Sequence, residues 1–331
     1  MTTMIIGAGL VGCQVARILV AQGQRPVLLD RAFQAGSVAQ IVPLDSVDSV
    51  VVDVLKPLTI AAALGRYAPT RLVHLAANPM LTIGGQRDPY GAVELNIMGT
   101  MNVLEAARSA GVKRVVIASS NTLNHHLDRG AATGNSLAED SFPRPISFYA
   151  TCKQTIENLG LNYARWFDME FAALRYGAVC GPWSGAGGGG PSNVFLTLLR
   201  DALAGREATV PDTTLEWVYS KDAAMATVLA LTAARLGDDP PNGGVFNITM
   251  GCDVNAVALE QAVRTVIPGA RTRRVPPPLD TPALRANLGV SDISRARSAL
   301  GYAPAFDITA AVRDTVAWLE TTEPSPKKQS T

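Results

Sequence analysis

The stretch Thr3-Met4-Ile5-Ile6-Gly7-Ala8-Gly9-Leu10-Val11-Gly12 decides the fold class of this chain. A short apolar run leads directly into a glycine turn of the form GxGxxG, and apolar residues at helical spacing follow it. The first glycine permits a tight turn, the second lets a ligand approach the backbone, and the third lets helix and strand pack closely. The helix N-terminus then offers amide donors to a phosphate. This context predicts a dinucleotide-binding unit, whereas a lone glycine turn chosen for packing is the plain alternative.

The first half of the chain alternates short apolar runs with amphipathic stretches. Strands rich in Val, Ile and Leu are predicted at residues 3–6, 26–30, 49–52, 71–75 and 114–119. Helices are predicted between them at 11–22, 58–67 and 90–110. Strand–helix–strand alternation implies right-handed crossovers, so we expect an α/β protein with a doubly wound parallel Rossmann sheet.

The second half predicts a smaller, partly interleaved C-terminal lobe for the substrate. We expect strands at 171–176 and 245–248 and helices at 193–204, 223–235 and 308–320. A loop is predicted at 177–191, and its glycine-rich run at 185–190 is expected to be flexible and not to lead straight into a helix. Residues 268–282 are predicted to be a connector. The dinucleotide-binding domain is therefore assigned residues 1–176 plus about 212–250. The substrate lobe is assigned about 177–211 plus 251–322, and 323–331 a disordered tail.

Composition excludes several classes of protein. The 331 residues are 47% hydrophobic and 17% charged, which is incompatible with intrinsic disorder. A net charge of +1, without a long block of one sign, argues against nucleic acid or a membrane surface as partner. We see no apolar run of the ~18 residues that a membrane helix needs. Four widely spaced cysteines predict reduced thiols, and we expect a cytoplasmic protein with a small-molecule substrate.

Asp30 ends the second predicted strand, at about the distance from the first glycine where a ribose-binding acid is expected. A carboxylate there accepts hydrogen bonds from the ribose of NAD and repels the 2′-phosphate of NADP. We therefore expect NAD as the cofactor. Arg31 complicates this choice, because an arginine beside the acid can hold that phosphate.

Tyr149 and Lys153 stand four residues apart, which puts both side chains on one face of a helix. A nearby ammonium favours the phenolate and lowers the pKa of the tyrosine, so that it can serve as an acid/base. The pattern is common, and an exposed helix pair is its ordinary alternative. Its weight comes from Ser119 and Ser120, which end a predicted central strand where open α/β sheets bind ligands.

Further motifs follow in order along the chain. They are 7–12, Asp53, Val73-His74-Leu75-Ala76-Ala77, Asn96-Ile97-Met98-Gly99-Thr100 with 102–107, 115–120, Tyr149 with Lys153, Leu174-Arg175-Tyr176 with Gly181-Pro182, and 292–297 with Leu300-Gly301-Tyr302. From Met4 to about Glu320 the chain resembles the extended short-chain dehydrogenase/reductases, the NAD-dependent epimerase/dehydratase family.

The resemblance implies a role for each matching residue. Ser120 matches the catalytic serine, Tyr149 the acid/base, and Lys153 the residue that also holds the nicotinamide ribose. Contacts to the cofactor are expected from Gly7, Gly9, Leu10, Val11, Gly12, Asp30, Arg31, Asp53, Val54, Ala76, Ala77, Asn96, Tyr149 and Lys153. Contacts to the substrate are expected from Asn121, Thr122, His125, Arg175, Ala178, Asn193 and Trp217.

The chain departs from the family where nucleotide-sugar enzymes hold a diphosphate. Ala178 stands in place of an asparagine, and Leu215 in place of an arginine. Glu216 follows, and we expect its negative charge close to the diphosphate position. Because a diphosphate site needs its bidentate donor, we expect a substrate other than a nucleotide diphosphate sugar. Backbone amides of the glycine-rich run could compensate by cradling phosphate.

Histidine offers no convincing metal site. His125 and His126 are adjacent, so they do not face one point on a strand or helix, and we expect no metal. The two histidines either contact the substrate or belong to a polar loop beside the active site.

These residues favour an NAD-dependent oxidoreductase that interconverts a secondary alcohol and a ketone on a small polar substrate, such as a sugar, sugar acid or hydroxy-acid derivative. The alternative is a nucleotide-sugar epimerase with transient hydride transfer. A dehydratase is less favoured, because Asn121 and Thr122 stand where an acid pair is expected. A non-catalytic dinucleotide sensor is the remote alternative, since such proteins tend to lose the tyrosine or the lysine.

The resemblance also implies a homodimer, in which the helix after Asn96 and the helix with Tyr149 pair with their twofold mates. Ile156, Leu159 and Tyr163 form an apolar stripe available for that contact. The alternative is that this stripe packs on the sheet.

Overall fold

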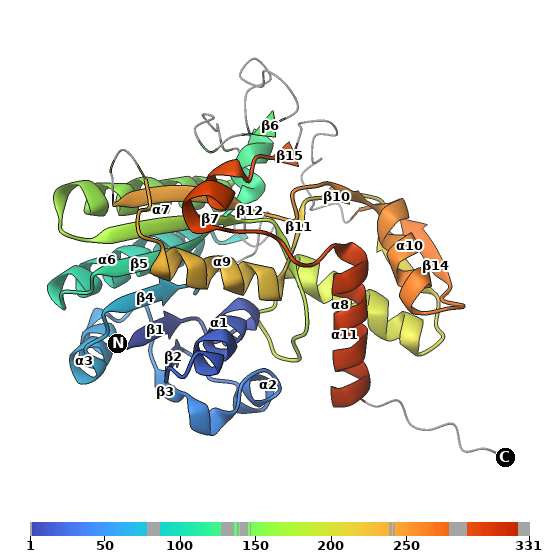
Figure 1. Cartoon of the computed structure of the whole chain (residues 1–331), viewed down its shortest axis with the longest axis horizontal. Helices are drawn as coiled ribbons and strands as arrows, with labels where there is room; N and C mark the ends of the chain where they lie inside the picture. The colour runs from blue at the N-terminus through green and yellow to red at the C-terminus, as the bar shows by residue number, and fades with distance from the viewer. Residues whose placement is uncertain are drawn as a thin grey trace.

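The centre of the molecule is a seven-stranded parallel sheet. The computed structural model describes residues 2–77, 87–126, 136–137, 139, 145, 147–237, 240, 242–277 and 290–323. In the described residues the strand order is β12-β7-β5-β4-β1-β2-β3, and every neighbouring pair is parallel. Figure 1 shows this sheet in the left half of the molecule, with helices on both faces. The predicted doubly wound Rossmann fold is confirmed.

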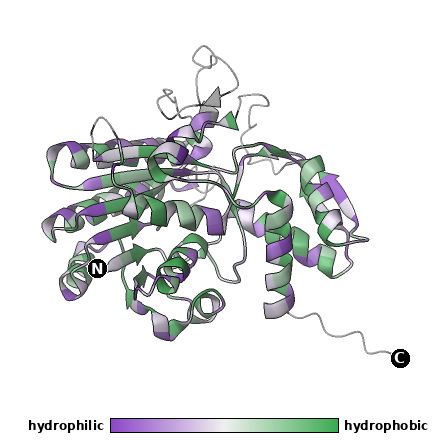
Figure 2. Ribbon diagram, viewed as in Figure 1, coloured by the Kyte–Doolittle hydropathy of each residue, from purple (hydrophilic) through white to green (hydrophobic). Residues whose placement is uncertain are grey.

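The strands lie close to where the apolar runs predicted them. They are β1 (Thr3–Ile6), β2 (Val27–Asp30), β3 (Asp48–Val51), β4 (Arg71–His74), β5 (Arg114–Ser120), β7 (Glu170–Tyr176) and β12 (Gly243–Ile248). All four residues of β1 are buried, as are all six of β12. Because helices cover both faces, these strands read as continuous apolar runs, and Figure 2 shows them largely in green.

Two layers of helices enclose the sheet. On one face α1 (Leu10–Ala21) packs against α9 (Ser220–Thr232). On the other face α6 (Gly99–Ser109) lies between α3 (Pro57–Tyr67) and α7 (Phe148–Trp166). The helix predicted at 90–110 is divided, because α5 (Pro89–Val93) runs into a π-turn, η2 (Glu94–Met98), before α6 begins. The crossover therefore exists as predicted, but it is not one regular helix.

Three helices and several short strands gather beside the carboxyl ends of the strands, toward the right of Figure 1. The helices there are α8 (Gly190–Leu203), α10 (Ala256–Val266) and α11 (Ile308–Thr322). The short strand pairs are β8 (Ala178–Cys180) with β11 (Trp217–Tyr219), β9 (Ala208–Pro211) with β14 (Thr272–Val275), and β10 (Thr214–Leu215) with β13 (Val254–Asn255). Smaller elements are α2 (Ala35–Ala39), η1 (Leu44–Ser46), η3 (Asn121–His126), β6 (Ser136–Leu137) paired with β15 (Val290–Ser291), and η4 (Ala296–Leu300).

The loop predicted at 177–191 is corrected in two ways. Residues of that segment form β8, and α8 begins at Gly190 with Pro191 in its first turn. Proline is favoured there because the first helical N–H has no partner inside the helix. The glycine-rich run thus leads straight into a helix, contrary to the prediction. Residues 278–282 of the predicted connector and 324–331 of the predicted tail lie outside the described residues.

The apolar stripe of α7 packs inward. Ile156 and Tyr163 are buried against the sheet and α6, and Leu159 packs on the same cluster. The Tyr163 hydroxyl donates to Glu105 Oε2 at 2.7 Å. The stripe therefore belongs to the core of the single chain, which was the alternative reading. The apolar side chains exposed in this region include those of Tyr90, Met98 and Phe148.

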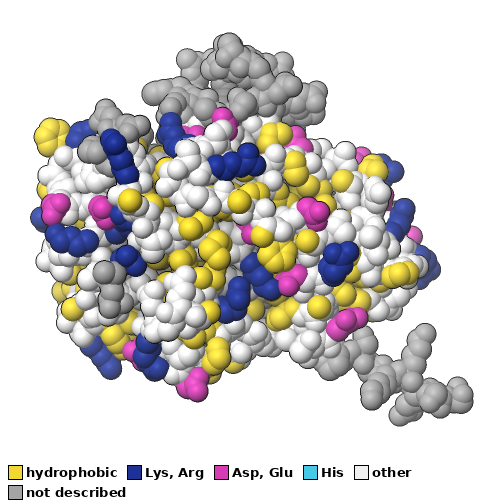
Figure 3. All heavy atoms as spheres, viewed as in Figure 1, with side chains coloured by type: hydrophobic (Ala, Val, Ile, Leu, Met, Phe, Trp, Pro, Cys, Tyr) yellow, Lys and Arg dark blue, Asp and Glu magenta, His cyan; other side chains and the backbone are white. Residues whose placement is uncertain are grey.

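The surface has no strong electrostatic polarity on the face shown in Figure 3, where Lys, Arg, Asp and Glu side chains are scattered. All four cysteines are free, and Cys252 alone among them is exposed. Within the part of the chain that the structure describes, no helix is long and apolar enough to cross a membrane.

Candidate active site

The glycine turn after β1 has the shape that a dinucleotide requires. Gly7 has φ +107°, a conformation that side chains other than glycine rarely adopt. A Cβ on Gly12 would lie 2.0 Å from the Gly7 carbonyl oxygen, so only glycine lets α1 pack on the turn. Gly9 differs, because a Cβ there would meet nothing closer than Gly187 O at 3.6 Å. The fold does not demand glycine at that position, whereas close approach of a pyrophosphate does.

Asp30 couples the end of β2 to the glycine turn. Its Oδ2 accepts from the Ala8 backbone N–H and its Oδ1 from the Ala32 backbone N–H, both at 2.9 Å. The carboxylate lines the cavity next to Arg31. Asp53 lines the same end of the cavity, and its Oδ1 accepts from Leu55 N at 3.0 Å. Two acids therefore stand at the adenosine end of the expected cofactor position.

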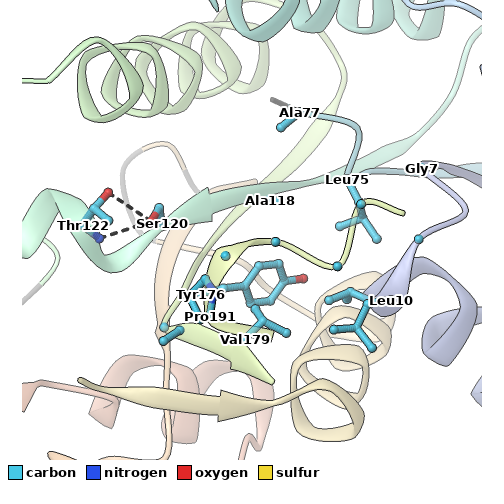
Figure 4. Close-up of a pocket in the computed structure, with 18 of the residues that line it drawn as sticks. Gly7, Leu10, Leu75, Ala77, Ala118, Ser120, Thr122, Tyr176, Val179 and Pro191 are labelled. Carbon is cyan, nitrogen blue, oxygen red and sulfur yellow. Dashed lines mark hydrogen bonds between the residues drawn. The ribbon is translucent and has the colours of Figure 1, made fainter. Parts of the chain in front are cut away.

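One cavity of about 810 Å³ runs from this turn along the carboxyl ends of the strands into the smaller lobe. Its floor includes Gly7, Leu75 and Ala118, which Figure 4 labels on the sheet side. The charged side chains among its described lining residues are Asp30, Arg31, Asp53, Lys153 and Glu216. The lining in the smaller lobe is mainly apolar and includes Pro191, Val194, Pro211, Leu215, Trp217, Val254 and Leu259.

The glycine-rich loop before α8 reaches across this cavity. Residues 186–190 line it opposite the glycine turn. Ala186 N donates to Gln34 Oε1 at 2.7 Å, and Gln34 Nε2 donates to Ala186 O at 3.2 Å. A Cβ on Gly185 would lie 2.7 Å from Gln34 Oε1 and 2.9 Å from Ser37 Oγ, so glycine permits the close approach. The loop thereby ties the smaller lobe to the segment after β2.

The three predicted catalytic residues meet in the middle of the cavity. Ser120 ends β5, Tyr149 lies in the first turn of α7, and Lys153 follows one turn later. Ser147 caps α7 by accepting from Ala150 N at 3.2 Å, which fixes where the helix begins. Lys153 Nζ donates to Ala118 O at 2.6 Å and lies 5.5 Å from the centre of the Tyr149 ring. All three residues line the cavity, as predicted.

Burial dominates the ionisation of this group. Burial raises the pKa of Tyr149 to about 12, while its hydrogen bond with Ser120 acts in the lowering direction. Burial also lowers the pKa of Lys153 to about 8, against the raising effect of Glu157. The predicted lowering of the tyrosine pKa by the lysine is therefore wrong for the chain alone. Lys153 gives its hydrogen bond to the backbone of β5 instead.

Behind the catalytic residues lies a buried ion pair. Arg175 of β7 binds Glu157 of α7 through two hydrogen bonds of 2.9 and 2.8 Å. Ser119 also donates to Glu157. Because Glu157 lies one turn beyond Lys153, this pair holds α7 against the ends of β5 and β7. Arg175 does not line the cavity, so its predicted contact with substrate is replaced by this structural role.

Glu216 contacts Asn121, the residue that follows Ser120. It is 5% exposed, and its carboxylate accepts from Ser291 N at 2.7 Å, Ser291 Oγ at 2.7 Å and Asn121 Nδ2 at 3.2 Å. Burial raises the pKa of this carboxyl. The sequence predicted its charge near a diphosphate, whereas the structure places the carboxylate next to Asn121, at the reacting end of the cavity.

Most of the remaining predicted ligand contacts line the cavity. Those that do are Leu10, Val11, Val54, Ala76, Ala77, Asn121, Thr122, Ala178 and Trp217. Asn96 and Asn193 do not, and Asn96 Nδ2 of η2 donates to Ala92 O of α5 instead. His125 belongs to η3, where the structure describes its backbone only. Among the described residues no group of three His, Cys, Asp or Glu side chains is placed to hold a metal.

Sequence reasoning missed the wall of the cavity in the smaller lobe. Gln34, Pro211, Thr213, Val254, Asn255 and Leu259 line it but carry no recognisable motif. The one usable signal in the sequence was the glycine-rich run, which predicted a flexible loop. It did not predict the hydrogen bonds of that loop to Gln34.

The chain has a parallel Rossmann sheet, a glycine turn shaped for a dinucleotide, and a Ser–Tyr–Lys group in the same cavity. Together these features define an NAD-dependent enzyme of the extended short-chain dehydrogenase/reductase type. The model of the NAD dependent epimerase/dehydratase family matches residues 3–249. The chain belongs to that family.

Characterised relatives cover nearly the whole chain at low identity. A UDP-glucose 4-epimerase of Mycolicibacterium smegmatis is 27% identical over 322 residues, 96% of this chain and 97% of that protein. A UDP-glucuronate 4-epimerase of Thermodesulfobacterium geofontis is 22% identical and is covered to 93%. The crystal structure of Thermus thermophilus UDP-glucose 4-epimerase in complex with NAD superposes with a TM-score of 0.81 at 24% identity, covering 97% of this chain and 100% of that one.

Proposed function

We propose that this protein is an NAD-dependent oxidoreductase that interconverts a secondary alcohol and a ketone. The observation that carries the proposal is the meeting of Ser120, Tyr149 and Lys153 in one cavity with the glycine turn. Tyr149 takes the hydroxyl proton of the substrate, and Ser120 holds the same oxygen. Lys153 would hold the nicotinamide ribose. Bound NAD supplies the hydride acceptor and a positive charge near the tyrosine.

Tyr149, Ser120 and Lys153 each have a separate role in the reaction. To accept the hydroxyl proton of the substrate Tyr149 must first be the phenolate, and because burial disfavours the phenolate, the hydrogen bond with Ser120 and the positive charge of bound NAD would have to offset the effect of burial. Lys153 is fixed by Ala118 O, so it keeps one distance to the tyrosine ring.

A small polar substrate is favoured by the walls of the smaller lobe. Leu215 stands there in place of an arginine, and Glu216 is the charged residue of that part of the lining. A buried carboxylate disfavours an anionic group at the reacting end. The absence of an arginine at Leu215 supports a substrate without a diphosphate, and Glu216 supports an uncharged, polyhydroxy group at the reacting end.

A second candidate is a nucleotide-sugar 4-epimerase with transient hydride transfer. Two observations favour it: the relatives with that activity span the whole chain, and the glycine-rich run leads into the N-terminus of α8 beside the cavity. Backbone amides at a helix N-terminus suit a phosphate. This geometry strengthens the epimerase relative to what the sequence alone supports.

One experiment separates the two candidates. The purified protein is incubated with NAD and with free sugars, sugar acids, UDP-glucose, UDP-galactose and UDP-glucuronate, while NADH absorbance and product identity are followed. Net NADH with a free substrate supports the oxidoreductase. An epimer formed without net NADH, or micromolar UDP-sugar binding by calorimetry, supports the epimerase and removes the first candidate.

We also propose the division of labour between the lobes and the assembly state. Residues 1–176 with about 212–250 hold NAD, and about 177–211 with 251–322 hold the substrate. The protein acts in the cytoplasm as a homodimer. Support for the dimer now comes from exposed Met98, which is 52% accessible, and exposed Tyr90 and Phe148 near the start of α6 and α7, not from the α7 stripe.

A further inference from the structure

The cavity has an apolar wall in the smaller lobe that the catalytic group does not use. This apolar wall is formed by the side chains of six residues, Val194, Pro211, Leu215, Trp217, Val254 and Leu259. Three of them, Trp217, Val254 and Leu259, are nearly fully buried. The Trp217 ring packs on the Phe195 ring of α8, with the ring centres 5.8 Å apart. The apolar wall is therefore a firm surface held by the core of the lobe.

The apolar wall begins close to the catalytic serine. Ser120 ends β5, and Ala178 follows the end of the neighbouring strand β7. Ala178 is paired in register with Trp217 of β11. Leu215 stands two residues before Trp217 and is paired in register with Val254 of β13. A substrate whose alcohol lies at Ser120 can therefore extend along the apolar wall without leaving the cavity.

The apolar wall is a poor site for a charged group. Among the described residues that line this lobe, Glu216 carries the one charged side chain, and Thr213 and Asn255 are polar. Backbone donors here are already used, because Ala178 N donates to Glu216 O at 2.7 Å and Ala258 N donates to Asn255 Oδ1 at 2.9 Å. Burying an ion without partners is unfavourable, whereas burying hydrocarbon is favourable.

We propose that the apolar wall binds an uncharged hydrocarbon substituent of the substrate. The substrate is then amphipathic: its hydroxyl groups lie at the reacting end, near Ser120 and Glu216, and its hydrocarbon part lies against the apolar wall. The inference rests on the proposed function, because that function places the alcohol at Ser120. It gives the lobe an occupant other than the nucleotide of the second candidate.

The test is a series of secondary alcohols that differ only in chain length: 2-butanol, 2-pentanol, 2-hexanol and 2-heptanol. Their binding is measured by calorimetry on NADH-loaded protein, in which an alcohol binds without being oxidised. Each methylene that lies on the apolar wall leaves water. We therefore expect the Kd to fall about fourfold per methylene, or about sixtyfold from 2-butanol to 2-heptanol.

Leu215→Gln places a polar group in the apolar wall at a half-buried position. We expect the Kd of 2-heptanol to rise about fivefold in this variant, and that of 2-butanol to change least. Leu203→Gln is the matched control, because Leu203 is also half-buried in the smaller lobe but does not line the cavity. Thermal unfolding of both variants shows whether the lobe stays folded.

Three results would overturn the proposal. They are a Kd that does not fall along the series, with no binding of 2-heptanol up to its solubility counted as such; an equal loss in Leu203→Gln and Leu215→Gln; and micromolar binding of UDP-glucose to the NAD-loaded protein. The series needs no turnover, so it is decided separately from the proposed function. A protein that binds the series as expected but turns over no alcohol or ketone refutes the function alone, and one that oxidises free sugars with a flat series refutes the role of the apolar wall alone.

Discussion

The hydrogen-bonded contact between Gln34 and the glycine-rich loop should control how fast the cofactor leaves. The loop lines the cavity opposite the glycine turn, and Gly187 O lies at ordinary contact distance from a Cβ placed on Gly9. NAD bound along that turn would lie between the loop and the sheet. Release requires the loop to move away, and that movement breaks both bonds between Gln34 and Ala186.

The magnitude follows from those two bonds. A net intramolecular hydrogen bond contributes about 0.5–1.5 kcal/mol, and both bonds here are solvent-exposed, so we take the low end of that range for each. Gln34→Ala then destabilises the closed loop by about 1 kcal/mol, which raises its open fraction roughly fivefold. The Ser184–Ser37 contact at 3.2 Å remains and limits the effect.

The assay is the dissociation rate of NAD from loaded protein, measured after dilution into an enzyme system that consumes free NAD. We expect the rate constant to rise about fivefold in Gln34→Ala. Gln40→Ala is the control, because Gln40 is exposed at the end of the same short helix and does not contact the loop. A Gln34→Ala rate within twofold of wild type would refute the reasoning, as would an equal acceleration in Gln40→Ala.

Three further outcomes are expected. Tyr149→Phe should lower turnover at least ~100-fold with little change in NAD affinity, whereas Lys153→Ala should damage both; near-normal turnover of Tyr149→Phe contradicts the chemistry. Burial lowers the pKa of His74 to about 3, below its ordinary 6.5, so the unfolded chain binds a proton in that interval that the folded chain does not. Stability should therefore fall as pH falls from 6.5 toward 3, and the unfolding free energy of His74→Gln should fall less steeply; parallel curves count against this. Light scattering at micromolar concentration should give a dimer, and a particle of ~35 kDa removes that claim.

The sequence predicts those parts of the site that are formed by residues close together along the chain. The glycine turn requires a strand before it and a helix after it, and both can be read from neighbouring residues. Tyr149 and Lys153 share a helix face, so their spacing alone brings them together. The meeting of Ser120 with this pair follows because the carboxyl ends of parallel strands lie at one edge of the sheet.

The missed parts depend on contacts between segments far apart in the chain. Arg175 stands in a motif beside the active site, but its partner Glu157 belongs to another element, so spacing could not predict the ion pair. The strand β10 (Thr214–Leu215) has only two residues and shows no periodicity. Leu259 and Pro211 look like ordinary core residues until the fold places them on the cavity wall.

The pKa of Tyr149 failed as a prediction because two opposing effects had to be weighed. The sequence shows that an ammonium is near, and that favours the phenolate. It does not show that the same ammonium donates to Ala118 O, or that burial of the tyrosine hydroxyl outweighs the effect of that ammonium. In the protein without cofactor, burial outweighs the nearby ammonium and raises the pKa of Tyr149. Formation of the phenolate therefore depends more on Ser120 and on the bound nicotinamide.

Whether the enzyme is a net oxidoreductase or an epimerase depends on the fate of the reduced cofactor more than on the hydride step, which both share. A released NADH leaves the substrate oxidised, whereas a retained one can return the hydride to the other face of the same carbon. The loop tied to Gln34 encloses the cavity over the glycine turn, and the same loop continues into α8 beside the substrate. If Gln34→Ala speeds cofactor release and also converts epimer formation into net NADH production, the loop sets the reaction outcome. If release speeds up while the product is unchanged, the outcome is set by the substrate pocket beside Leu215 and Glu216 instead.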